Sequence, residues 1–387
     1  MAVTQVHVNN QLIKWRTRVM REWRRGNLFS PYMGESPTNI IQVTNELKSG
    51  GDVLNIPIVG ALRGPGVSTG PLTGNEEKLD DYGMRLWVDW SRNAVLLTRA
   101  QMRKSSFEQL ELVRPLLTEW GNALLRDEIV QAFMALPSES PPANLGNEAT
   151  AGQRVNGILY DAASDAQKDK WHLDNADRIL YGASKSNNLG THAASLATLD
   201  DPTDRASAKI LLLAKRIARS ASPGITPYMD DEDQGREWFV VFVGSEAYRD
   251  LANDPAILDA NTNARPRETS IDKNPLFASG DLQYQGVIIR EIPEISDFAN
   301  LPTAGAGATT QVQPMFFCGQ NAMVIGWGQM PKPTERSEDD YGFLIGRGVE
   351  AVWGIGKVFK KRDPASATAQ LIQWGVVTVW VAAPPDT

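Results

Sequence analysis

The chain has 387 residues, of which 42% are hydrophobic and 22% are charged, a composition typical of a folded protein with room for two compact lobes. Its 46 acidic residues outnumber its 39 basic residues, and the formal net charge of −7 argues against a protein dedicated to nucleic-acid binding, because such proteins are usually basic. No apolar run approaches the roughly 18 residues that a membrane span needs, and we expect no secretory signal at the N-terminus.

The single cysteine, Cys318, lies in the apolar run PMFFCG. A lone cysteine excludes an intrachain disulfide, and its apolar surroundings predict a buried structural thiol. We therefore expect the chain to be made in a reducing cytosol.

The N-terminal segment predicts a basic amphipathic helix over residues 10–25, with Gly26 at a C-cap position. Its apolar side chains recur at helical spacing on one stripe, at Leu12, Trp15, Val19 and Trp23. Basic side chains occupy the other faces, at Lys14, Arg16, Arg18, Arg21, Arg24 and Arg25. The helix either docks on its own domain or reaches a neighbouring subunit or scaffold, with membrane or nucleic-acid binding as further alternatives.

Residues 53–98 predict two extended segments around a long loop. The stretch 53–60 alternates in hydrophobicity, with Pro57 suited to an edge strand, and 84–97 alternates too. Residues 61–81 between them are rich in Gly, Pro, Ser, Thr and charge, and we expect no apolar face there. Because such a long loop usually has a function or a partner, the pattern predicts a projecting β-hairpin. Its acidic residues are predicted to form a solvated face, at Glu76, Glu77, Asp80 and Asp81.

Residues 105–136 carry the strongest helical signal of the chain. Apolar residues recur along it at spacings of three and four, at Leu110, Val113, Leu117, Trp120 and Leu124. Ser105 and Glu108 fit a capping box, and Pro115 predicts a kink or a restart near residue 112. The length of roughly 30 residues favours a long spine helix over a typical globular one.

The rest of the chain predicts one α/β lobe followed by returning strands. Residues 137–200 are expected to be mostly irregular. The lobe, 200–330, is predicted to contain an amphipathic helix and four strands, at 203–220, 238–244, 286–292, 315–319 and 322–327. Ser245 is expected to cap a short helix through Leu251. From Tyr341 to Ala383 the pattern returns to long strands.

No pattern of catalytic or cofactor-binding residues emerges. The glycines of 64–70 lack the spacing of a nucleotide-binding turn. The three histidines are scattered, without zinc-ligand spacing, at His7, His172 and His192. The acidic cluster 230–233 fails as a calcium loop, because the twelfth position from Asp231 is Phe242 rather than glutamate. We therefore expect no catalytic site, no cofactor and no metal, and a solvated acidic loop at 230–233.

Five segments in order resemble the N-four-like major capsid family of tailed bacteriophages, at 66–95, 239–255, 274–295, 316–329 and 338–359. One departure is Asn93, where the family pattern has histidine. The resemblance implies an α+β fold of the Hong Kong 97 type, with an N-arm, an extended β-hairpin loop, a spine helix, a peripheral lobe and an axial lobe. It also implies an icosahedral shell of many copies around double-stranded DNA, assembled first as a procapsid.

This resemblance predicts a division of the chain into five segments. They are an N-terminal arm (1–38), an extended loop with flanking strands (39–98), a peripheral domain with the spine helix (99–200), an axial domain (201–335) and the returning strands of the peripheral domain (336–387). Interface residues are predicted on the arm and the loop, at Trp15, Arg16, Arg18, Val19, Trp23, Glu76, Glu77, Lys78, Asp80 and Asp81. Expected partners are further copies in hexamers and pentamers, with scaffolding, portal and decoration proteins as candidates and no membrane. The expected location is the virion, after synthesis in the host bacterial cytoplasm.

Two alternatives stay open from the sequence. An encapsulin-like cargo shell shares the fold and differs in what it encloses. A small-molecule α/β enzyme would need a convergent polar pocket, which no motif indicates.

Some members of this fold crosslink a loop lysine to a neighbour's asparagine. Lys78 is the only lysine between Lys48 and Lys104, and acidic neighbours favour its protonated form. We therefore predict a shell held by noncovalent contacts alone.

Overall fold

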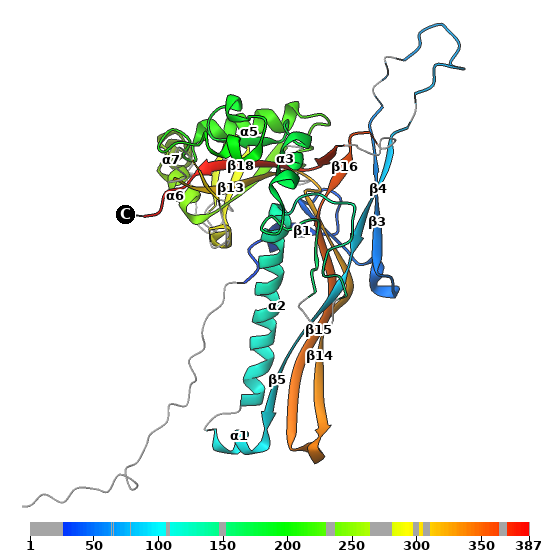
Figure 1. The fold of residues 1–387 in the computed structure, drawn as a ribbon, viewed down its shortest axis with the longest axis vertical. Helices are drawn as coiled ribbons and strands as arrows, with labels where there is room; N and C mark the ends of the chain where they lie inside the picture. The colour runs from blue at the N-terminus through cyan, green and yellow to red at the C-terminus, as the bar shows by residue number, and fades with distance from the viewer. Residues whose placement is uncertain are drawn as a thin grey trace, which may run out of the picture. The chain divides into compact units, whose positions relative to one another are not determined.

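The structure is a computed structural model that describes residues 26–386 except 63, 65, 78, 106–108, 147–151, 230–236, 264–280, 297–301, 305–309 and 364–369. It has the predicted α+β composition (Figure 1). The predicted helix 10–25 and the acidic cluster 230–233 lie outside the described residues. None of the helices within the described ranges is long and apolar enough to cross a membrane.

The chain forms two compact units. The smaller contains 92–125 and 331–351 with the described part of 1–27, and the larger contains 28–91, 126–330 and 352–387. Four long elements contribute residues to both units, namely α2 (Gln109–Met134), β5 (Asp89–Thr98), β14 (Met323–Asp339) and β15 (Leu344–Lys357).

A mixed eight-stranded sheet lies at the centre of the larger unit. Its main strands, in spatial order, are β10 (Leu282–Tyr284), β11 (Val287–Glu291), β9 (Glu237–Val243), β13 (Thr310–Cys318), β18 (Val376–Ala382) and β7 (Ile179–Tyr181). Two short strands add to it, β8 (Tyr228–Met229) on β9 and β12 (Thr303–Ala304) on β13. The inner strands are mostly apolar, with buried runs such as Phe239–Val243 and Met315–Cys318, because both faces of the sheet are covered.

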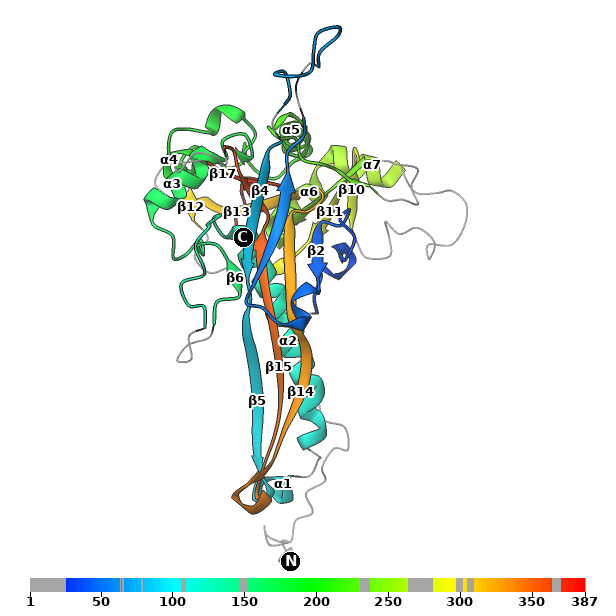
Figure 2. The same ribbon diagram turned by 90° about the vertical axis from the view of Figure 1, so that its right-hand side faces the viewer.

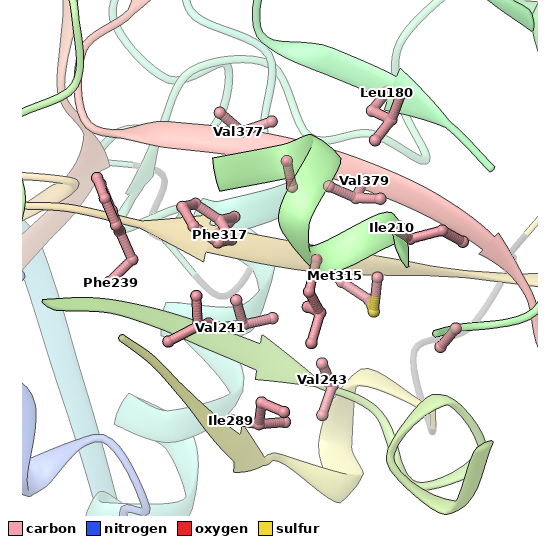
Figure 3. Packing of buried hydrophobic residues seen from close by; sticks show 14 of the residues in the cluster. Leu180, Ile210, Phe239, Val241, Val243, Ile289, Met315, Phe317, Val377 and Val379 are labelled. Carbon is pink, nitrogen blue, oxygen red and sulfur yellow. The ribbon is translucent and has the colours of Figure 1, made fainter. Parts of the chain in front are cut away.

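Three helices cover one face of this sheet, α5 (Ala208–Ser220), α6 (Ser245–Asn253) and α7 (Pro255–Asn263). Alternate strand residues such as Val241, Met315 and Phe317 point into the shared core, as Figure 3 shows. α5 contributes Ile210 and Ile217 from its buried stripe. The predicted amphipathic helix at 203–220 is thus confirmed, beginning at residue 208.

Aromatic side chains cover the opposite face of the sheet. Phe242 of β9 lies 4.9 Å from Phe29, and Phe316 of β13 stacks on Phe133 with ring centroids 5.0 Å apart. Phe133 belongs to the last turn of α2, and Phe29 precedes the short 3-10 helix Ser30–Tyr32. The C-terminal end of α2 is therefore fixed against the sheet by aromatic packing.

The predicted β-hairpin is confirmed, and it is formed by β3 (Val53–Val59) and β4 (Asp81–Trp87). The strands are antiparallel, with Pro57 opposite Gly83. Leu54, Ile58 and Met84 point into a second core, as the alternating pattern predicts. Figure 2 shows the loop between the two strands, drawn in blue, extending away from the elements around it.

The remaining strands form a six-stranded and a two-stranded sheet. The six-stranded sheet has the order β1 (Met33–Gly34), β2 (Ile41–Thr44), β14, β15 and β5, with β6 (Val155–Asn156) paired to β15. The two-stranded sheet contains β16 (Phe359–Lys361) and β17 (Leu371–Gln373). Further 3-10 turns lie at Glu46–Ser49, Lys185–Asn187 and Pro293–Ile295.

In the smaller unit, α1 (Arg99–Lys104) begins after Thr98, whose side chain accepts a hydrogen bond from the Gln101 N–H. The backbone N–H of Arg99 donates to the carbonyl of Phe343 at 3.0 Å. The turn between β14 and β15, Asp340–Gly342, holds Tyr341 in the left-handed region at φ 55°.

Two local predictions were wrong. The described part of α2 runs from Gln109 through Pro115 without the predicted restart, while the predicted Ser105–Glu108 capping box lies partly outside the described residues and stays a prediction. The N-cap of α6 is Gly244, and Ser245 is its first helical residue. Residues 137–200 are mostly irregular, as predicted, although they also contain α3 (Asp165–Asp174), α4 (His192–Leu196), β6 and β7. α3 begins with a capping box that its weak apolar periodicity obscured.

The sheets do not follow the predicted consecutive segments. β7 and β18 join the sheet of the 200–330 lobe from outside that range, whereas β14 belongs to the other sheet. Strand pairing across distant segments carries no local signal, so sequence patterns alone could not assign these strands. The five-segment division stays a prediction.

Candidate functional site

The candidate site is the β3–β4 hairpin and its base. Of the predicted interface residues, those of the arm lie outside the described residues, at Trp15, Arg16, Arg18, Val19 and Trp23, and so does Lys78. Glu76, Glu77 and Asp81 are exposed, and Asp80 is half-buried.

Two loop carboxylates hold the backbone of their own loop. The Gly64 N–H donates to Glu77 Oε2 and the Gly74 N–H donates to Glu76 Oε2, each at 2.7 Å. These charge-assisted hydrogen bonds order a segment that has no regular ladder beyond Val59 and Asp81.

Asp80 departs from the predicted solvated face. Its carboxylate pairs with the ammonium of Lys360, whose side chain is only 6% exposed. Beside it, Lys361 Nζ lies 2.7 Å from Glu139 Oε2, and the Tyr82 hydroxyl donates to Glu139 Oε1 at 3.0 Å. Burying the Lys360 ammonium is costly without a nearby negative charge, and the Asp80 carboxylate supplies that charge. The two lysines of β16 thereby fix the base of the hairpin.

The hairpin also presents apolar side chains to solvent, which agrees with a loop that has no apolar face buried against its own domain. Leu62 and Leu72 are 66% and 68% exposed. Other large apolar residues of the hairpin are exposed as well, at Val53, Val59, Val67 and Leu79. Clustered apolar exposure of this kind typically marks a surface that binds another protein.

The smaller unit has exposed apolar residues of its own, at Val95, Leu96, Leu116, Tyr341 and Phe343. Tyr341 is fully exposed at the β14–β15 turn, in a backbone region that bulky residues seldom adopt. An aromatic side chain held in this way is available to a partner.

Inside the larger unit, Glu128 of α2 forms a fully bonded ionic cluster. Its Oε1 accepts from Arg154 Nε at 2.7 Å, and its Oε2 accepts from Trp353 Nε1 at 2.6 Å. Arg154 also donates to the carbonyl of Trp90 at 3.0 Å. Burial raises the pKa of Glu128 despite the neighbouring guanidinium. The cluster joins four segments and leaves no carboxylate oxygen free for chemistry.

Lys357 of β15 is buried at the C-terminal end of α2. Its Nζ donates to the Phe133 carbonyl at 2.9 Å and to Gln373 Oε1 at 2.6 Å. No ion pair among the described residues includes Lys357, and burial lowers its pKa to about 7. The hydrogen bond to the Phe133 carbonyl, in the last turn of α2, anchors this helix end.

Two of the histidines predicted to be scattered are brought together by the fold. The His172 and His192 rings are 6.4 Å apart, and Tyr181 Oη lies 2.9 Å from His172 Nδ1 and 2.7 Å from His192 Nδ1. His192 Nε2 lies 2.8 Å from the Tyr160 hydroxyl, and His172 Nε2 lies 2.6 Å from the Leu189 carbonyl.

These contacts assign the hydrogen-bond directions. A carbonyl only accepts, so His172 carries its proton on Nε2 and accepts from Tyr181 at Nδ1. Tyr181 then accepts from His192 Nδ1–H, and His192 Nε2 accepts from Tyr160. Burial lowers the pKa of His192 to about 3, which keeps this ring neutral and fits the assigned directions. Every ring nitrogen is bonded to protein, so neither histidine is a free metal ligand.

The described residues offer no reactive arrangement. They contain no group of three or more His, Cys, Asp or Glu placed to hold a metal ion. Cys318 is buried, as predicted, and burial raises the pKa of its thiol. A groove of about 530 Å³ includes Asp89, but both its oxygens accept backbone hydrogen bonds, from Trp90 and Gly146.

Comparison with known proteins gives a consistent result. The family model described as phage capsid protein matches residues 4–384. The structure is similar to the capsid asymmetric unit of cyanophage Pam1, at 31% identity and a TM-score of 0.83 over 100% of both chains. It is also similar to the capsid of Ralstonia phage GP4, at 18% identity and a TM-score of 0.70 over 100% of both chains.

A more distant similarity is to the head of Helicobacter pylori bacteriophage KHP40, at 12% identity and a TM-score of 0.63 over 99% of this chain and 98% of that one. At this identity the likeness concerns the fold alone. No curated protein sequence matches significantly.

Proposed function

Because the chain belongs to the phage capsid protein family, we propose that many copies of it, as hexamers and pentamers, form an icosahedral shell around double-stranded DNA. The fold is of the Hong Kong 97 type, as the sequence resemblance predicted. The chain is a structural major capsid protein, self-assembles with further copies and is a component of the virion. We further propose synthesis in the host bacterial cytoplasm and no catalytic role.

One observation supports assembly through the hairpin: its exposed leucines are carried on a base that is held by buried Lys360 and partly buried Lys361. The Lys360–Asp80 and Lys361–Glu139 pairs hold the base, so the apolar side chains are presented on an ordered support. Burying a leucine side chain fully is worth about 1.5–3 kcal/mol. A neighbouring copy lying under residues 61–81 would recover that energy many times in one shell.

The other segments take roles consistent with this arrangement. We propose that α2 with the returning strands of 336–387 forms the peripheral lobe and that the 201–335 segment points to the capsomer axis. The arm residues Trp15, Val19 and Trp23 would contact a neighbouring copy, while the arm arginines meet acidic surface or DNA. Scaffolding, portal and decoration proteins are further proposed partners.

The test is assembly followed by analysis of the contents. Light scattering and negative-stain microscopy of the purified chain should show closed shells, capsomers or irregular polyheads. Particles from infected cells should contain double-stranded DNA, whereas an enzyme cargo would favour an encapsulin-like shell. A chain that stays monomeric at high concentration, with and without a scaffold, would contradict the proposal.

A further inference from the structure

The outer face of α5 is a basic stripe. One side of the helix packs on the eight-stranded sheet, and the other is exposed. The exposed side chains follow the helical repeat of three or four, at Lys209, Leu212, Arg216 and Arg219. The helix contains no acidic residue, although the whole chain carries a net charge of −7.

Within the described part of the chain, most of this positive charge is not compensated. No carboxylate of the described residues pairs with Lys209 or Arg216. Lys215 is half-buried and donates to the carbonyl of Gln285, which is neutral. Arg219 pairs with Glu237 at 2.6 Å. Four cations against this one carboxylate leave three positive charges along the stripe.

Helix stability does not explain the pattern. Cations are favoured in the last turn of a helix, which suits Arg219, and disfavoured in the first turn, where Lys209 lies. Asp254 accepts from the Ala208 N–H at 2.8 Å and already caps that first turn. A cation at both ends of one face therefore indicates a function outside the helix.

The chemistry of the face favours phosphate over protein. Protein–protein interface cores are enriched in aromatic residues and depleted of lysine. The stripe has no aromatic residue, and Leu212 is its one exposed apolar side chain. Beside Leu212, a shallow depression of about 390 Å³ is lined by Lys215, Arg216 and Arg219. Lysine and arginine are the usual contacts of the nucleic-acid backbone.

We propose that the outer face of α5 binds the phosphate backbone of double-stranded DNA without sequence preference. The inference rests on the proposed function, which places DNA inside the shell. Residues 209–219 rise about 15 Å along the helix, enough to meet phosphates over about four base pairs. The phosphates of bound DNA would neutralise the positive charges on the outer face of α5.

The test uses the unassembled full-length chain and a short DNA duplex, with binding followed by fluorescence anisotropy across a salt series. The slope of log K against log salt is negative, and each phosphate contact adds about 0.9 to its magnitude. The double variant Lys209→Gln with Arg216→Gln should therefore reduce the magnitude of the slope by about 1.8. The matched control is Lys185→Gln with Lys332→Gln, which removes the same charge from exposed positions elsewhere. A duplex of scrambled sequence should bind equally well.

The result expected is a smaller slope for the α5 double variant alone, with shells still visible by negative stain. An unchanged slope, or an equal fall in the control, overturns the inference. Normal duplex binding with lost assembly also overturns it and makes the face a contact between copies. Failure of the wild-type chain to form shells would instead refute the proposed function, and duplex binding would still decide the role of α5.

Discussion

The interior of the larger unit and its β3–β4 hairpin distribute polar and apolar side chains in opposite ways. The interior encloses polar groups in hydrogen-bonded networks, around Glu128, Lys357 and the His172–His192 pair. The hairpin carries Leu62 and Leu72 into solvent. Burying a polar group costs free energy unless the group is hydrogen-bonded. An exposed apolar side chain gives no hydrophobic stabilisation until another surface covers it. Interior networks therefore stabilise the single subunit, and the hairpin stabilises the assembly.

The largest effect on the single subunit is expected from Arg154→Met. The variant leaves the Glu128 carboxylate buried without its cation, which should lower the free energy of unfolding by about 3–5 kcal/mol. Urea unfolding of the unassembled chain measures the loss. The control is Lys170→Met, which removes a mostly exposed partner of Asp174 and should cost less than about 1 kcal/mol. Equal losses would mean that the buried cluster has no special role.

The histidine chain predicts a loss of stability in acid. His192 has an ordinary pKa of about 6.5 when unfolded and about 3 when folded, so the unfolded chain binds more protons between these values. Its contribution to the free energy of unfolding is full above pH 6.5 and is lost as the pH falls, by up to about 1.4 kcal/mol per pH unit.

The variant His192→Gln isolates that contribution. Glutamine supplies one donor and one acceptor for Tyr181 and Tyr160 but does not titrate. The difference between wild type and variant, measured by urea unfolding from pH 7 to pH 5, should shrink as the pH falls. A constant difference would show that folding does not lower the pKa of the His192 ring.

An intermediate effect is expected at the hairpin. Leu72→Asn should weaken assembly by about 1.5–3 kcal/mol per subunit, which raises the protein concentration required for assembly roughly tenfold or more. The unfolding of the unassembled chain should change by less than about 0.5 kcal/mol, because the side chain is 68% exposed. Leu258→Asn on α7, also more than half exposed, is the matched control. A comparable assembly defect in the control would remove the distinction between the hairpin and the rest of the surface.

The sequence predicts one side of this comparison better than the other. Alternation gave the two hairpin strands, and apolar spacing gave α2, because both signals are local. The interior networks are not local: Asp80 and Lys360 are 280 positions apart, and Arg154 and Glu128 meet only through the fold. The exposed leucines had a signal, since Leu62, Leu72 and Leu79 stand in a loop of otherwise polar composition. That signal was obscured by the Gly- and Pro-rich surroundings.

No effect is expected from replacing Lys78, because we predict that this lysine forms no covalent crosslink between copies. An isopeptide bond requires a neutral lysine, desolvated beside a carboxylate that takes its proton. The two sequence neighbours of Lys78, Glu77 and Leu79, are exposed, and nearby carboxylates favour the ammonium form of a lysine. We therefore expect mature particles to dissociate into single chains on boiling in detergent, with the same electrophoretic pattern for Lys78→Ala. A ladder of covalent oligomers that disappears in the variant would show that the hairpin contributes chemistry as well as contact. The assembled shell would then be held covalently, through the same exposed hairpin that the comparison treats as a noncovalent surface.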